Sequence, residues 1–279
     1  MTNSADTRVW LITGASSGFG RAISEAATTR GDAVAAGARN ADAFGYLPEG
    51  VHPLSLDVTN PDQREAAVAE TIERFGRVDV LVNNAGRTQV GAVEETTDEE
   101  LRSLFELHFF APAALTCLVL PHMRRQGGGA IVQMSSVGGQ VTAPGFGAYC
   151  ATKFALEGLT ETLRDEVAGF GIRTVIVEPG AFRTGLFRPG AAYESEAMPE
   201  YAESVGPTRA YVRTSDGLQP GDPVKAAQAI LTALDADAPP LRLVLGADAI
   251  GNVERRLKSL SDELATWRAV GEATALDEP

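Results

Sequence analysis

The chain has 279 residues and a formal net charge of −13, and this acidic balance argues against binding to nucleic acids or to anionic membranes, which requires a basic face. Two cysteines and three scattered histidines make neither a disulfide framework nor a metal site, so the expected compartment is the reducing cytosol, the cytoplasm. Residues 1–7 are short and polar, and no apolar run approaches the ~20 residues of a membrane span, so we expect a soluble, unexported protein.

The first predicted elements are a buried strand, a glycine-rich turn and a helix. Residues 8–13 form an apolar run without alternation, which is typical of a strand buried on both faces, and residues 21–30 indicate a helix. Between them lie Gly14, Gly18 and Gly20. Because glycine has no Cβ, backbone N–H groups and a helix N-terminus can approach a phosphate there. The turn therefore predicts a pyrophosphate cradle, although a purely structural turn would use the same glycines.

Arg39 follows the second predicted strand, residues 32–38. Dinucleotide-binding folds place at this point the residue that reads the adenosine ribose, an acid for a 2′-hydroxyl and an arginine for a 2′-phosphate. No acid is available at Ala38, and a guanidinium matches phosphate geometry. The expected cofactor is therefore NADP(H). The third strand ends at Asp57, which would either contact the adenine or cap the helix that Pro61 begins.

Strands and helices continue to alternate along the chain, which implies a parallel sheet with right-handed crossovers and helices on both faces. The candidate residues lie at the C-terminal ends of strands, where such sheets bind ligands. We expect a single doubly wound (Rossmann) α/β domain of about seven strands, with its core over residues 8–250. The remaining expected elements are strands at 51–56, 78–82, 130–134, 172–177 and 241–245, and helices at 61–75, 98–125, 147–168, 223–236 and 248–270.

Two segments depart from simple alternation. The long helix from Asp98 carries His108 on an apolar stripe, and Pro112 lacks the N–H that would bond the carbonyl of residue 108, so a kink is predicted there that leaves this carbonyl free for water. Residues 185–221 are rich in Gly, Pro, Ala and Glu and predict a long loop. A mobile substrate lid and a surface excursion both remain open. Residues 248–279 are expected to form an amphipathic helix and a frayed acidic tail.

Tyr149 and Lys153 lie four residues apart in a predicted helix and therefore on one face. A nearby positive charge favours phenolate and lowers the pKa of a tyrosine from ~10. Ser136 follows the strand at 130–134, where its hydroxyl can hydrogen-bond a substrate oxygen that exchanges a proton with Tyr149. The spacing predicts a general acid–base centre, although it also fits an exposed surface pair.

Five motifs, in this order and spacing, resemble those of the short-chain dehydrogenase/reductase family: Thr13–Gly20, Asn83–Gly86, Ser136, Tyr149–Lys153 and Pro179–Gly180. The resemblance covers about residues 8–250. It implies hydride transfer between NADP(H) and a carbonyl or secondary alcohol, and the run 149–158 is similar to members that act on bulky lipophilic substrates.

The resemblance also implies roles for single residues. Tyr149 would be the acid–base, Ser136 would polarise the substrate oxygen, and Lys153 would bind the nicotinamide ribose and lower the tyrosine pKa. The implied cofactor contacts are, for the pyrophosphate, Gly14, Ser16, Ser17, Gly18, Phe19 and Gly20; for the adenosine part, Arg39, Asp57 and Val58; for the adjoining ribose, Asn84, Ala85 and Gly86; and for the nicotinamide, Pro179, Gly180 and Thr184.

The sequence departs from the family pattern at two places. His108 stands where the family usually has an asparagine that completes a catalytic tetrad, so we expect His108 to contribute through its side chain or its backbone carbonyl. Ser17 stands where NADP-preferring members often carry a basic residue, so the NADP(H) prediction depends on Arg39. The alternatives to an enzyme of this family are a non-catalytic NADP(H)-sensing regulator and a sugar-nucleotide epimerase or dehydratase. The resemblance implies a homodimer or homotetramer packed through helices 98–125 and 147–168.

Overall fold

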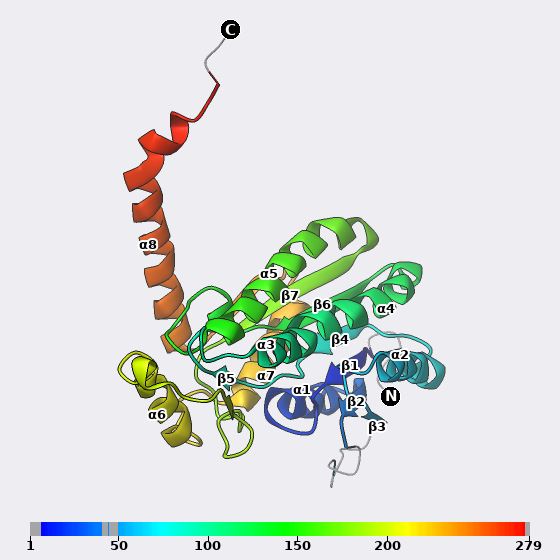
Figure 1. Ribbon diagram of the computed structural model, residues 1–279. Helices are drawn as coiled ribbons and strands as arrows, with labels where there is room; N and C mark the ends of the chain where they lie inside the picture. The colour runs from blue at the N-terminus through cyan, green and yellow to red at the C-terminus, as the bar shows by residue number, and fades with distance from the viewer. Residues whose placement is uncertain (1–6, 41–43, 45–49, 277–279) are drawn as a thin grey trace.

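A parallel sheet of seven strands forms the centre of the molecule, in the order β3-β2-β1-β4-β6-β7-β9 (Figure 1). The structure is a computed structural model that describes residues 7–40, 44 and 50–276. The seven strands are β1 (Val9–Thr13), β2 (Ala33–Ala38), β3 (Val51–Ser55), β4 (Val80–Asn83), β6 (Gly129–Met134), β7 (Ile172–Pro179) and β9 (Arg242–Leu245). The predicted doubly wound α/β sheet in a single domain is confirmed.

The order of the strands reverses direction once. From β1 the chain moves outward to β2 and β3, and it then returns to β4, which pairs with the other side of β1. Every residue of β1 and β4 is buried, as their unbroken apolar sequences predict for strands covered on both faces. Ligands bind such sheets at the switch point between the two halves, beyond the C-terminal strand ends.

Helices cover both faces of the sheet. Helices α1 (Gly18–Thr29) and α7 (Pro223–Asp235) pack together over one face, and their buried residues share one apolar core with alternate residues of the strands. The opposite core is covered by α2 (Pro61–Phe75), α4 (Ala111–Gln126) and α5 (Gly147–Val167).

The long helix predicted over 98–125 is interrupted. Helix α3 (Asp98–Phe105) is followed by a π-helical turn, Glu106–Phe110, in which the N–H of Ala111 donates to the carbonyl of Glu106, and α4 then begins. The missing N–H of Pro112 accounts for the change in hydrogen bonding. At the place of the predicted kink the structure has a π-helical turn, which ends two residues before the proline.

By length and composition the helical stretch 98–126 could cross a membrane, which corrects the expectation that no apolar stretch approaches that length. In the fold it contacts α2, α5 and the sheet, and Leu104, Leu115 and Val119 lie in the buried part of the domain.

The segment 185–221 contains more structure than the predicted loop. Strand β8 (Tyr193–Glu194) pairs with β5 (Gln89–Val90), and helix α6 (Gly206–Thr214) follows. A small separate apolar cluster beneath it includes Val90 and Val212. The guanidinium of Arg209 is buried and pairs with Glu95 at 2.8 Å and Glu194 at 3.1 Å. The expectation of a segment without regular structure is wrong, because this ion-pair cluster fastens it to the residues after β5.

Helix α8 (Ala247–Glu272) starts beside the sheet and then projects away from the body of the molecule (Figure 1). Its residues up to Val253 contact the domain, whereas those from Glu254 onward are exposed. The expected amphipathic helix over 248–270 is present, and residues 277–279 of the expected frayed tail lie outside the described residues.

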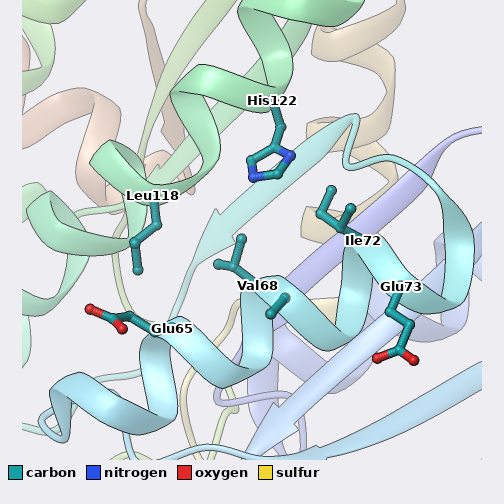
Figure 2. Close-up of a pocket in the computed structure, with 7 residues that line it drawn as sticks. Glu65, Val68, Ile72, Glu73, Leu118 and His122 are labelled. Carbon is teal, nitrogen blue, oxygen red and sulfur yellow. The ribbon is translucent and has the colours of Figure 1, made fainter.

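A surface hollow of about 510 Å³ lies between α2 and α4 (Figure 2). It is lined by Glu65, Val68, Ala69, Ile72, Glu73, Leu118 and His122. None of the residues predicted to bind cofactor or substrate lines it.

Candidate active site

The glycine-rich turn between β1 and α1 has a shape that only glycine allows. Gly14 and Gly18 have φ of 62° and 54°, in the left-handed region that other residues rarely adopt. A Cβ on Gly14 would lie 2.9 Å from the Cα of Ala85, and one on Gly20 would clash with the carbonyl oxygen of Gly14. Glycine at these positions therefore lets the turn pack closely on itself and on the loop after β4.

Thr13 joins this turn to the loop after β4. Its hydroxyl oxygen accepts hydrogen bonds from the N–H groups of Asn84 at 2.9 Å and Ala85 at 3.0 Å. The side-chain amide of Asn84 donates back to the carbonyls of Thr13 at 2.8 Å and Gly14 at 3.1 Å. The predicted ribose-binding residue Asn84 thus uses its amide to hold the two loops together.

The first turn of α1 fits a pyrophosphate. It carries no acidic residue, and the side chain of Ser17, which precedes it beside Ser16, makes no capping hydrogen bond. The first N–H groups of a helix lack intrahelical partners and carry partial positive charge, so a phosphate can take the place of the missing cap.

The loop after β7 closes against this turn. A Cβ on Gly18 would lie 3.0 Å from the Cβ of Thr184, and the rings of Phe19 and Phe182 lie 5.2 Å apart. The structure therefore brings the predicted pyrophosphate and nicotinamide segments together. Gly180, which follows Pro179 at the end of β7, donates its N–H to the carbonyl of Leu245 at 2.9 Å.

Asp57 and Arg39 lie on the β2–β3 side of the turn. Arg39 is exposed directly after β2. Asp57 accepts hydrogen bonds from the hydroxyl of Thr59 at 2.7 Å and from its N–H at 2.9 Å. The hydrogen bond from the Thr59 hydroxyl is the main cause that lowers the pKa of Asp57, and the positive charge of Arg39 lowers it further. Helix α2 is capped by Asn60, so the alternative in which Asp57 caps this helix is wrong.

Val58 differs from Asp57 in its surroundings. Its side chain is buried, and its carbonyl accepts a hydrogen bond from the guanidinium of Arg64 at 2.7 Å. Its backbone is therefore held in place from the side of α2.

Ser136, Tyr149 and Lys153 meet where β6 ends. The hydroxyl of Ser136 accepts a hydrogen bond from the N–H of Gly138 at 3.0 Å and lies close enough to the Tyr149 phenol to lower its pKa. Lys153, on the same face of α5, donates from Nζ to the carbonyl of Met134 at 2.9 Å. Its Nζ lies 5.7 Å from the centre of the Tyr149 ring.

The pKa values at this cluster reflect burial more than mutual attraction. Burial raises the pKa of Tyr149 to about 12, while the nearby hydroxyl of Ser136 acts in the opposite direction. Burial lowers the pKa of Lys153 to about 8, and the carboxylate of Glu157 opposes this. The expected lowering of the Tyr149 pKa by the Lys153 charge is therefore not found among the protein's own groups, because desolvation disfavours both charged forms.

His108 lies behind the cluster, with its ring edge-on to Tyr149 at 5.6 Å between centres. Its Nε2 accepts from the N–H of Arg87 at 3.2 Å, and its Nδ1 lies 2.9 Å from the hydroxyl oxygen of Thr152. That hydroxyl donates to the carbonyl of Tyr149 at 2.7 Å, so Nδ1 carries the proton in the His108–Thr152 bond.

Two contacts thus fix His108 in one neutral form. Burial lowers its pKa well below 6.5, and the positive charges of Lys153 and Arg87 add to this. The sequence predicts a catalytic role for His108. In the structure its imidazole bonds to the backbone of Arg87 and, through the hydroxyl of Thr152, to that of Tyr149. Thr152 was missed by the sequence reasoning, although it lies inside the Tyr149–Lys153 motif.

A buried cluster of acids beneath the site was also missed. The hydroxyl of Ser135 donates to Glu157 at 2.5 Å, Gln140 donates to Glu178, and the guanidinium of Arg242 bridges Glu157 and Glu178 at 3.1 and 3.0 Å. Two weak signals were present, since Glu157 lies four residues after Lys153 and Glu178 directly precedes the Pro179–Gly180 motif.

Comparison with known proteins agrees with this geometry. Residues 8–194 match the family model described as short chain dehydrogenase. The chain is 38% identical over 275 residues to oxidoreductase BOA17 of Botryotinia fuckeliana, and this match covers 96% of the chain and all of that protein.

Solved structures have the same fold. A short-chain dehydrogenase from Streptomyces avermitilis is 55% identical and superposes with a TM-score of 0.91 over 98% of this chain and 100% of that one. A short chain dehydrogenase from Burkholderia cenocepacia in complex with NADP is 26% identical, with a TM-score of 0.70 and 98% of each chain covered. The chain therefore belongs to the short-chain dehydrogenase family and is an oxidoreductase.

Proposed function

We propose that this protein is an NADP(H)-dependent oxidoreductase that interconverts a carbonyl and a secondary alcohol on a lipophilic small molecule. The observation that carries the proposal is the meeting of Ser136, Tyr149 and Lys153 where β6 ends, on the side of the sheet that holds the glycine turn. When bound, the nicotinamide cofactor supplies or accepts the hydride. The residues that would hold it are those of the glycine turn, Arg39, the loop after β4 and the segment 179–184.

In the reducing direction the Tyr149 phenol donates its proton to the carbonyl oxygen of the substrate. The hydroxyl of Ser136 bonds to the same oxygen and orients it toward the phenol. The ammonium of Lys153, held by the carbonyl of Met134, stabilises the phenolate that remains. Because burial raises the pKa of Tyr149, its phenol donates a proton less readily. The positive charge of Lys153 has to offset this effect by stabilising the phenolate for the transfer to proceed.

Arg39 supports NADP(H) over NAD(H). Its guanidinium is exposed directly after β2 and offers a planar fork to a 2′-phosphate. The preceding residue, Ala38, offers no carboxylate to a 2′-hydroxyl. The NADP complex of the Burkholderia cenocepacia relative supports the same cofactor for this chain.

The apolar surroundings of Tyr149 support a lipophilic substrate. The ring of Phe146 lies 6.1 Å from that of Tyr149 and packs against the apolar cluster under the segment 185–221. The rings of Phe187 and Tyr211 lie 5.8 Å apart within the same segment. A substrate that reaches Tyr149 beside these rings would exchange water for apolar contacts.

The test is consumption of NADPH with a panel of ketones of increasing chain length. We expect turnover that rises with apolar size and falls at least ~10²-fold in Tyr149→Phe, the usual contribution of a general acid–base. Tyr211→Phe, which removes an exposed phenol of the substrate segment, is the matched control. Retention of turnover in Tyr149→Phe would refute the assignment, and NADPH binding without turnover of any ketone would favour the regulator instead.

We also propose that the protein acts in the cytosol as a homo-oligomer. The two cysteines are free thiols, as expected in a reducing compartment. Phe110, just before α4, and Phe154 on α5 are exposed, and they offer an apolar surface for packing between subunits. Light scattering of the purified protein measures the assembly.

A further inference from the structure

The exposed part of α8 carries one regular apolar stripe. Its members are Ile250, Val253, Leu257, Leu260, Leu264 and Trp267, separated by three, four, three, four and three residues. This alternation is the a/d pattern of a coiled coil, in which two helices pack side by side along the stripe.

Nothing in the described part of the chain covers this stripe beyond its base. Val253 is buried against the domain, but Leu257 is 56% exposed, Leu264 65% and Trp267 62%. The helix stands clear of the body along this length (Figure 1). Monomeric proteins rarely leave such a contiguous row of large apolar side chains in water, and an isolated helix gains most of its stability from packing its apolar face.

The opposite side of α8 is polar. Lys258 pairs there with Asp262 at 2.8 Å, and Arg268, at the border of the stripe, pairs with Glu272 at 3.2 Å. The sequence therefore separates one apolar seam from a solvated face, as a two-helix coiled coil requires.

We propose that the α8 stripe is a coiled-coil surface for a second copy of this chain. Beside the stripe lie Arg256, Glu263 and Arg268, so two copies of α8 can place opposite charges against each other. In an antiparallel pair, Leu257 packs against the partner's Leu260, and Arg256 faces the partner's Glu263. In a parallel pair, Glu263 faces the partner's Arg268. Opposite charges at these flanking positions select the partner of a coiled coil and its direction, and one sequence here supplies both members of each pair.

The composition of α8 disfavours a lipid surface as the occupant. The helix has five acidic residues and four basic ones, whereas helices that lie on anionic membranes carry mainly Lys and Arg on the polar face. The stripe is also too narrow for a helix sunk into lipid, because its apolar positions are the two per heptad of a paired seam.

The main test compares two double variants of the full chain. Leu257→Asp with Leu264→Asp places two charges in the stripe. Ser259→Asp with Thr266→Asp places the same charges at the same spacing on the solvated side of the helix, at residues that are also exposed. Sedimentation velocity over a range of concentrations measures the mass of each protein, and turnover per subunit reports that the catalytic domain is folded.

We expect the stripe variant to have half the mass of the wild type while the control keeps the full mass. Amide hydrogen exchange in residues 254–270 should become faster only in the stripe variant. An unchanged mass in the stripe variant, or a wild type that is monomeric at every concentration, would overturn the proposal.

A charge exchange tests the pairing itself. Glu263→Arg should weaken the assembly, and adding Arg256→Glu should restore it in an antiparallel pair, whereas adding Arg268→Glu should restore it in a parallel one. Rescue by either second change supports the coiled coil and gives its direction. Rescue by neither contradicts it.

Discussion

His108 allows a sharp test of whether this site uses an imidazole as a proton carrier. The structure ties its two ring nitrogens to different partners, Nε2 to the N–H of Arg87 and Nδ1 to the hydroxyl of Thr152. Asparagine can reach the position of Nδ1, and glutamine that of Nε2. His108→Asn therefore keeps the Thr152 contact and loses the Arg87 contact, and His108→Gln does the reverse.

The two changes should differ in cost. His108→Asn leaves the half-buried N–H of Arg87 without its acceptor, which costs about 1–3 kcal/mol. In His108→Gln the hydroxyl of Thr152 still donates to the carbonyl of Tyr149, so the lost bond costs about 0.5–1.5 kcal/mol. We expect His108→Asn to be the less stable variant in urea unfolding.

The pH dependence has a definite sign. Because the pKa of His108 in the folded protein lies well below 6.5, only the unfolded chain takes up a proton just below that pH. The wild type therefore loses about 1 kcal/mol of stability from His108 between pH 6.5 and about 5.5. Either variant removes this contribution, which is measured as the difference between wild-type and variant stability across that range.

The pH–rate profile decides the role in catalysis. If His108 stays neutral and only positions the backbone, wild type and both variants should show no limb near pH 6.5, and turnover should fall by less than ~10-fold. A limb near pH 6.5 in the wild type that disappears in both variants, with a loss of ~10²-fold or more, would show that the imidazole itself carries protons. The expectation that the His108 carbonyl is free for a water molecule stays a prediction.

Three further changes test other parts of the site. Arg39→Asp should reverse the preference for NADPH over NADH, measured as the ratio of kcat/KM, and an unchanged ratio would mean that the 2′-phosphate is bound elsewhere. Gly20→Ala should weaken cofactor binding at least ~10-fold in a titration, since its Cβ would clash with the Gly14 carbonyl, whereas Gly206→Ala, with open space around it, should not. Burial and the nearby carboxylate of Glu157 raise the pKa of Glu178 to about 7, so the folded state holds a proton that the unfolded chain has lost, and stability should fall as pH rises from 4.5 to 7; in Glu178→Gln this fall should be smaller in urea-unfolding experiments.

The sequence predicts most of the fold because the relevant signals are local. The unbroken apolar runs identify the strands. Gly14 and Gly18 identify the turn through a conformation that other residues rarely adopt, and Gly20 through the lack of space for a Cβ. The interruption of the regular helix before Pro112 also follows from one missing N–H. In each case the residues that decide the structure lie within a few positions of it.

What the sequence could not predict depends on contacts between distant residues. Arg209 meets Glu95 across 114 positions, and no pattern links them, so residues 185–221 were expected to form a loop. The pKa of Tyr149 depends on how far neighbouring elements bury the phenol, which the spacing to Lys153 does not contain. Asp57 and Asn60 are equally good capping residues by type, and the turn at Thr59 decides between them.

The hydroxyl of Thr13 has a consequence for the energetics of cofactor binding. By accepting two N–H groups of the loop after β4, it connects the ends of the two strands that flank the switch point of the sheet. The two loops therefore lose their conformational entropy when the protein folds, and cofactor binding costs little further entropy in ordering them. Thr13→Val, which keeps the shape of the side chain, would transfer that ordering cost to the binding step.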